Sequence, residues 1–112
     1  MSEPRLPAAV EASALIRSVE AAGGFATVIN KGDSDAGAML ILTIENGSKA
    51  RLWERLPNLD GQRCFRVIRE QDPEKKREFE EYISRRVDRD PDSWVVELDI
   101  PNPERFIAEL GR

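Results

Sequence analysis

Two groups of charged residues have a spacing that could support chemistry, and the first is the stretch KGDSDAG, residues 31–37. It places Asp33 and Asp35 two positions apart among glycines. Carboxylates at this spacing occur in calcium-binding loops, and glycine-rich turns occur in phosphate-binding loops. The calcium frame fails, because Ile44 stands at its twelfth position, where an EF-hand needs glutamate, and the stretch lacks the GxxxxGK[ST] pattern. We therefore expect Asp33 and Asp35 to shape a turn and to bind no metal.

The second group is a basic hairpin over residues 49–69. It carries six basic residues and two acidic ones, a net charge of +4. Arginines with an aromatic ring between them can bind phosphates and stack on bases, and Arg and Trp are also common anchors of protein interfaces. The simpler alternative is a solvated sheet face whose arginines pair with an acidic helix. The candidate binding residues are Arg51, Trp53, Arg55, Arg63 and Arg66.

Further carboxylates occur in pairs near the end of the chain. Asp88, Asp90 and Asp92 alternate around Pro91, and Glu97 and Asp99 lie on the same side of a predicted strand. Such pairs can bind a metal or share a proton. Solvation in a turn and on an outward strand face is the commoner role of such acids, and we expect it here.

The chain has no histidine and one cysteine, Cys64. Nucleophilic triads that use histidine are therefore excluded, as are zinc sites built on histidine or on several cysteines. A single cysteine forms no internal disulfide, which fits a reducing cytoplasm. We expect Cys64 to act as a small buried hydrophobic residue, and we predict no catalytic residue and no cofactor.

The composition is that of a globular chain, with 40% apolar and 34% charged residues and a net charge of −4 in 112 residues. This length predicts a single domain over residues 1–112. No apolar run approaches the roughly 20 residues of a membrane helix, so no membrane partner is expected. The acidic net charge argues against a general nucleic-acid coat protein.

Hydrophobic periodicity predicts eight elements. Residues 8–22 have helical spacing and end at Gly23 and Gly24, and Asp72-Pro73 and Asn102-Pro103 begin two further helices. The strands are expected at 25–31, 38–44, 49–56, 63–70 and 93–100. The stretch 38–44 is apolar on both faces, which indicates a central strand, whereas 93–100 alternates like a half-buried one.

The order α-β-β-β-β-α-β-α predicts an α+β fold. We expect an antiparallel sheet of four to five strands with its helices packed on one face. The three strands between residues 38 and 70 form a meander around the Asn46-Gly47 turn, joined by the strand at 25–31. One buried cluster should contain Leu15, Val19, Val28, Leu40, Leu42, Phe79, Ile83, Trp94, Val96 and Leu98.

Two stretches, EAAGGFATVINKGDSDAGAMLI and YISRRVDRDPDSWVVELD, resemble the signatures of a family of small uncharacterised alphaproteobacterial proteins, a domain-of-unknown-function family. The resembling motifs are Gly-Asp-x-Asp-Ala-Gly and Asp-Pro-Asp-x-Trp-Val-Val-Glu. Ser93 departs from the second motif, where a large apolar residue is commoner. The resemblance implies a bacterial source and a cytoplasmic setting, and it carries no established activity.

These features favour a small cytoplasmic, non-enzymatic protein-interaction module whose partner is another protein or a second copy of the chain. The alternative is nucleic-acid binding through the hairpin at 49–69. A third class, an enzyme that works through carboxylates, would require a concave pocket with carboxylates of perturbed pKa. An interaction module would instead show an exposed apolar or Arg/Trp surface and no deep cleft.

Overall fold

The structure is a computed structural model, and it describes residues 6–110. Within this range, three helices and five strands follow the predicted order, and the expected α+β class is confirmed. The elements are α1 (Ala8–Ala21), β1 (Phe25–Asn30), β2 (Met39–Glu45), β3 (Ser48–Pro57), β4 (Arg63–Glu70), α2 (Lys76–Arg89), β5 (Trp94–Asp99) and α3 (Pro103–Leu110). None of the helices in this range has the length and apolar character needed to cross a membrane.

Helix α2 begins at Lys76 rather than at the predicted Asp72-Pro73. The Asp72 carboxylate accepts a hydrogen bond from the backbone N–H of Glu74 at 2.9 Å, and the backbone carbonyl of Asp72 accepts one from the N–H of Lys75. The expected capping residue thus closes a separate turn before the helix, a role that Asp fills as readily as that of an N-cap.

All five described strands form one sheet in the order β1-β5-β2-β3-β4. β2, β3 and β4 form the predicted antiparallel meander, and Asn46 and Gly47 make its first turn with φ angles of 51° and 76°. β1 does not join this meander, because β5 lies between β1 and β2. β5 is antiparallel to β1 and parallel to β2, so the sheet is largely antiparallel with one parallel pair.

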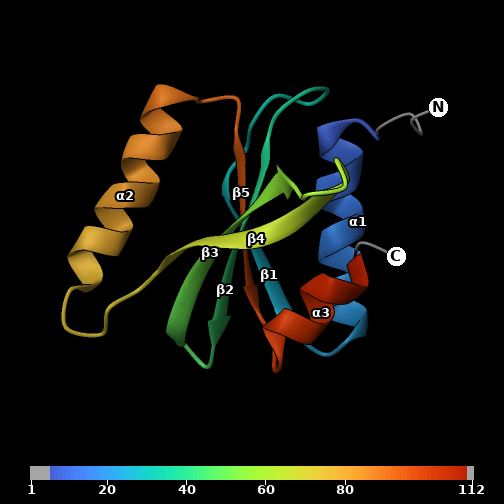
Figure 1. The fold of residues 1–112 in the computed structure, drawn as a ribbon. Coiled ribbons are helices and arrows are strands. Elements are labelled where there is room, and N and C mark those ends of the chain that lie inside the picture. Colours follow the sequence, from blue (N-terminus) through green and yellow to red (C-terminus); the bar gives the residue numbers. More distant parts are fainter. Residues whose placement is uncertain (1–5, 111–112) are drawn as a thin grey trace.

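Helices cover both faces of the sheet (Figure 1), and the expectation that they pack on one face is wrong. α1 and α3 pack on the face that carries Ile41 and Val96, and α2 packs on the face that carries Leu40 and Val95. β5 is therefore buried on both faces rather than half-buried as predicted. Consecutive apolar residues in β2 and β5 need cover on both sides, which one layer of helices cannot supply.

The predicted core divides between these two faces rather than forming one cluster. Ile83 is only half-buried beside α2, and Val28 is 39% exposed because β1 lies at the edge of the sheet. The other eight predicted core residues are buried. Leu15, Val19, Trp94, Val96 and Leu98 lie in the cluster between the sheet and α1 and α3, and Leu40, Leu42 and Phe79 lie in the cluster between the sheet and α2.

Candidate functional site

The loop between β1 and β2 is held by its own aspartate. The Asp33 carboxylate accepts hydrogen bonds from the backbone N–H groups of Ala36 at 2.8 Å and Asp35 at 3.0 Å. These N–H groups, that of Ala36 above all, lower the pKa of the Asp33 carboxyl. Asp33 therefore has the turn-forming contacts that the sequence predicts. Titration of the protein with metal ions would test the prediction that the loop binds no metal.

The same loop supplies the acceptors for the start of α1. Pro7 precedes the helix and its side chain makes no capping hydrogen bond. The carbonyls of Asp35 and Ser34 instead accept the N–H groups of Ala8 at 3.0 Å and Ala9 at 2.9 Å. The first N–H groups of a helix have no partner within the helix, so this loop replaces a side-chain cap.

The loop also packs closely against the turn that precedes β5. The Asp33 N–H donates to the Asp92 carbonyl at 2.9 Å, and the Trp94 indole N–H donates to the Asp33 carbonyl at 2.7 Å. A Cβ on Gly32 or Gly37 would lie 2.0 or 2.2 Å from the Asp92 carbonyl oxygen, so only glycine fits there. The two stretches that resemble the family signatures thus meet in one structural unit.

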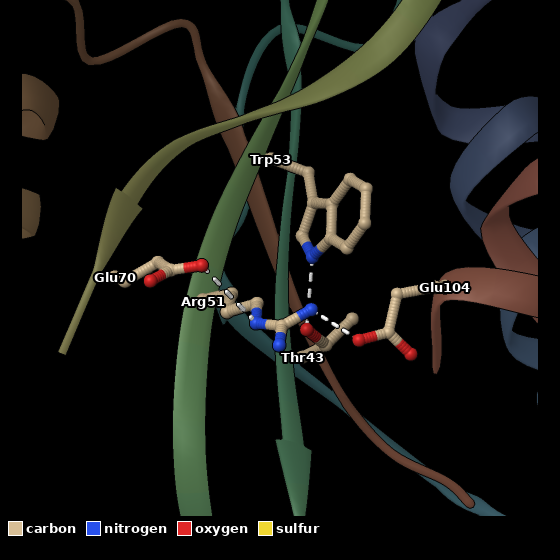
Figure 2. Close-up of polar contacts among 5 residues, drawn as sticks. All are labelled: Thr43, Arg51, Trp53, Glu70 and Glu104. Atoms are coloured by element: carbon tan, nitrogen blue, oxygen red, sulfur yellow. Dashed lines mark hydrogen bonds and ion pairs between the residues drawn. The ribbon is translucent and has the colours of Figure 1, made fainter. Parts of the chain in front are cut away.

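Two of the predicted binding residues, Arg51 and Trp53, lie on the sheet face that carries α1 and α3. Figure 2 shows Arg51 between Glu70 of β4 and Glu104 of α3, with which it forms ion pairs. Trp53 is 7% exposed, and its indole N–H donates to the Thr43 hydroxyl at 2.9 Å. A buried ring cannot stack on a base, so Trp53 does not offer the surface platform that the sequence suggested.

The remaining candidate arginines divide between a half-buried ion pair and an exposed edge. Arg55 forms an ion pair with Glu11 of α1, and its guanidinium stacks 4.8 Å above the Phe65 ring. Arg63 and Arg66 are exposed on β4, where the Arg63 guanidinium donates to the Arg55 carbonyl at 3.3 Å. The expected pairing of arginines with acidic helix residues therefore holds for Arg51 and Arg55, although their partners lie on α1 and α3 instead of α2.

A cavity of about 490 Å³ lies between the N-terminal end of α1, the 35–39 segment and the β3–β4 hairpin. Its charged lining is Glu11, Asp35, Glu54, Asp90 and Asp92 with Arg55 and Arg63. The Arg86 guanidinium donates two hydrogen bonds to Glu54, at 2.7 and 3.0 Å, and lowers the pKa of that carboxyl. A lowered pKa keeps the carboxylate ionised, the opposite of what a general acid needs at neutral pH.

Two other candidates have structural contacts. Asp99 accepts the Asn46 N–H at 3.1 Å, which fixes the β2–β3 turn against the end of β5. Cys64 lies in the edge strand β4 and is half-buried rather than buried as expected. Across residues 6–110, no group of three His, Cys, Asp or Glu side chains has the arrangement that would hold a metal ion.

The feature that the sequence analysis missed is the outer edge of β1. Within the described range β5 is the only strand paired with β1. The strand FATVIN has no charged residue, and Phe25 and Ile29 are 75% and 49% exposed. The signal was present in the sequence as an uncharged, β-branched run, but nothing in that run indicated that its outer side would lack a partner strand.

Solved structures of similar proteins share this fold. A crystal structure of a DUF1491 family protein from Caulobacter crescentus CB15 superposes with a TM-score of 0.74 at 35% identity, covering 85% of this chain and 88% of that one. An NMR structure of a DUF1491 family protein from the same organism superposes with a TM-score of 0.70 at 33% identity, covering 98% of this chain and 92% of that one. A solution structure of a protein from A. tumefaciens superposes with a TM-score of 0.70 at 30% identity, covering 88% of this chain and 89% of that one.

Among curated proteins, no significant match was found. The model of the family described as "Protein of unknown function (DUF1491)" matches residues 6–108. This match takes in every helix and strand described above, apart from the last two residues of α3. The chain therefore belongs to the DUF1491 family.

Proposed function

We propose that this protein is a non-enzymatic interaction module that binds a protein partner along the outer edge of β1. The observation that carries the proposal is an open strand edge with exposed apolar side chains and no charge. Unpaired N–H and C=O groups at a sheet edge are a template for a further strand, and extended peptides bind other domains in this way.

The opposite edge of the sheet supports this choice by contrast. β4 carries exposed Arg63, Arg66 and Arg69 along its length, and charged residues are a usual protection of an edge against unwanted pairing. β1 has no such residue between Phe25 and Asn30. Of the two edges, β1 is therefore the one suited to receive a strand.

The environment of the basic hairpin makes nucleic acid the weaker alternative. Trp53 is buried, and Arg51 and Arg55 are engaged by glutamates of α3 and α1. A phosphate backbone would have to compete with these ion pairs. The exposed arginines of β4 are what remains to support that alternative.

The setting is part of the proposal. The similar proteins from Caulobacter crescentus and A. tumefaciens support a bacterial source, in line with the alphaproteobacterial origin that the resemblance implied. The free thiol of Cys64 suits a reducing cytoplasm.

Site-specific photo-crosslinking tests the proposal. Phe25 is replaced by p-benzoylphenylalanine in one variant, and the exposed Arg66 of β4 is replaced in a matched control. After irradiation in cells, we expect a protein adduct at position 25 and none of comparable yield at position 66. Adducts at position 66 alone, or equal labelling at both positions, would contradict binding along β1.

A further inference from the structure

We infer that the strand added to β1 is β1 of a second copy of this chain, joined in antiparallel orientation across a twofold axis to form a continuous ten-stranded sheet. This inference rests on the proposed function and names its partner. The argument begins with the constraint that symmetry places on the register.

A twofold axis through two identical antiparallel strands must pass through a residue that lies opposite its own copy. A centre at Thr27 sets Thr27 opposite Thr27, Ala26 opposite Val28 and Phe25 opposite Ile29. A centre at Val28 would instead place Lys31 opposite Phe25, and a centre at Ala26 would leave Ile29 opposite Gly23. Thr27 is therefore the centre that brings all the exposed apolar side chains of β1 together.

The pairs in this register are ones that stabilise antiparallel strands. An aromatic ring opposite a β-branched side chain and a threonine opposite a threonine are favourable cross-strand pairs. The pairing of Phe25 with Ile29 occurs twice, once on each side of the axis, and covers the side chains that are 75% and 49% exposed in the single chain.

The faces of the sheet are also consistent with this register. Ala26 and Val28 lie opposite Leu98 and Val96 of β5, on the side covered by α1, and they would pair with each other across the axis. Phe25 and Thr27 lie opposite Asp99 and Glu97, on the other side. The irregularity in the ladder with β5 falls between Val28 and Asn30 and so includes Ile29, the last residue of the paired segment.

Electrostatics favour a second copy at β1 and oppose one at β4. Lys31, the first charged residue after β1, would lie opposite Gly23 of the second copy, so no like charges meet. Self-pairing of β4 would bring together two sets of Arg63, Arg66 and Arg69, and like charges directly opposite each other destabilise a sheet. One strand edge is a small contact beside the roughly 800 Å² per partner of a standard interface. We therefore expect a reversible dimer with micromolar affinity.

A cysteine scan tests the register directly. In a Cys64→Ser background, single cysteines replace each residue from Phe25 to Ile29, and the full-length variants are oxidised with diamide. Only Thr27→Cys places two cysteines directly opposite each other, within the 4.4–6.8 Å range of Cα separations that a disulfide spans. Neighbouring positions meet their own copies at about 7–8 Å or more, so we expect a cross-linked dimer for Thr27→Cys and monomers for the other four.

A charge substitution tests the same dimer without oxidation. Thr27→Lys sets two ammonium groups opposite each other at the axis, whereas Thr27→Val keeps a neutral pair. By light scattering at concentrations up to about 1 mM, we expect the unmodified chain and Thr27→Val to approach twice the chain mass of 12.7 kDa. Thr27→Lys should remain monomeric, with circular dichroism as the check that it is folded.

The outcomes separate this inference from the proposed function. A chain that stays monomeric to 1 mM, or cross-linking that is equal at all five cysteine positions, overturns the self-pairing. If photo-crosslinking at position 25 then still yields an adduct with a different protein, the proposed use of the β1 edge stands without it. If position 25 yields no adduct and the chain is also monomeric, both proposals fail.

Discussion

The hydroxyl of Ser93 is fully buried and finds no hydrogen-bond partner within residues 6–110. A buried polar group without a partner costs about 1–3 kcal/mol. We therefore predict that Ser93→Ala raises the free energy of unfolding by about 1–2 kcal/mol in urea denaturation. Ser34→Ala, at an exposed loop position, serves as the control and should change stability by less than about 0.5 kcal/mol. A destabilised Ser93→Ala protein would show that the hydroxyl has a partner in solution.

Asp33 should matter for the loop and not for metal. Replacement by alanine removes the acceptor for the N–H groups of Asp35 and Ala36, so we predict a lower melting temperature for Asp33→Ala and a smaller loss for Asp33→Asn, which keeps a side-chain oxygen. Because the pKa of Asp33 is lowered from 3.8 in the folded state, its contribution is complete above that pH and disappears as the pH falls through the folded value.

Calorimetric titration of the native chain with calcium, magnesium and manganese is the companion measurement. We expect no binding below millimolar concentrations, because the Asp33 carboxylate is already engaged by the backbone. A micromolar site that Asp35→Ala abolishes would reverse this assignment of the loop.

Helix α2 is tied to the sheet by an ion pair as well as by its apolar face. Arg86 and Glu54 are only 19% and 22% exposed and form a two-pronged contact. We predict that Glu54→Gln lowers the free energy of unfolding by about 1.5–3 kcal/mol, since hydrogen bonds to charged groups contribute this much. Glu81→Gln removes an exposed helical ion pair with Arg85 and should cost less than about 0.5 kcal/mol.

The same pair makes a signed prediction about pH. Arg86 lowers the pKa of Glu54 from its ordinary 4.5, so the stabilisation is complete above that value and is lost as the pH falls through the folded pKa. The difference in unfolding free energy between the native chain and Glu54→Gln should therefore be largest near neutral pH and shrink below about pH 4.5. A difference that stays constant from pH 7 to pH 3 would rule out this ionic contribution.

Local patterns predicted the individual elements well, and long-range pairing limited the rest. The Asn46-Gly47 turn and the adjacent meander depend on residues close in sequence, so the sequence pattern was sufficient for them. The insertion of β5 beside β2 pairs residues that are 55 positions apart in the sequence, and no local pattern specifies such a neighbour. Because β5 took that position, β1 became an edge, and its exposed side and the second layer of core could not be foreseen.

The candidate site shows the same division. Turn chemistry correctly assigned Asp33 to a loop, because an Asx turn depends on the next few residues. The alternation of Arg51, Trp53 and Arg55 along β3 places them on one face of the sheet. It could not reveal that α1 and α3 would cover that face, since their docking depends on the whole sheet.

The distribution of charge over the molecule leads to the last prediction, which concerns nucleic acid. The chain as a whole is acidic, and three exposed arginines, Arg63, Arg66 and Arg69, lie along β4. We expect fluorescence polarisation with labelled single- and double-stranded oligonucleotides to show no micromolar binding at about 50 mM salt.

Variants make this trial specific. If weak binding occurs, Arg63→Ala and Arg66→Ala should each reduce it on unrelated sequences, because phosphate contacts carry no sequence information. Trp53→Ala should affect stability and not base stacking, because the ring is buried. The cavity that it leaves should lower the free energy of unfolding by about 3–5 kcal/mol. Micromolar binding that falls by orders of magnitude between about 50 and 200 mM salt would show sequence-independent contacts between basic side chains and phosphates. In that case the β4 edge would replace β1 as the principal functional surface.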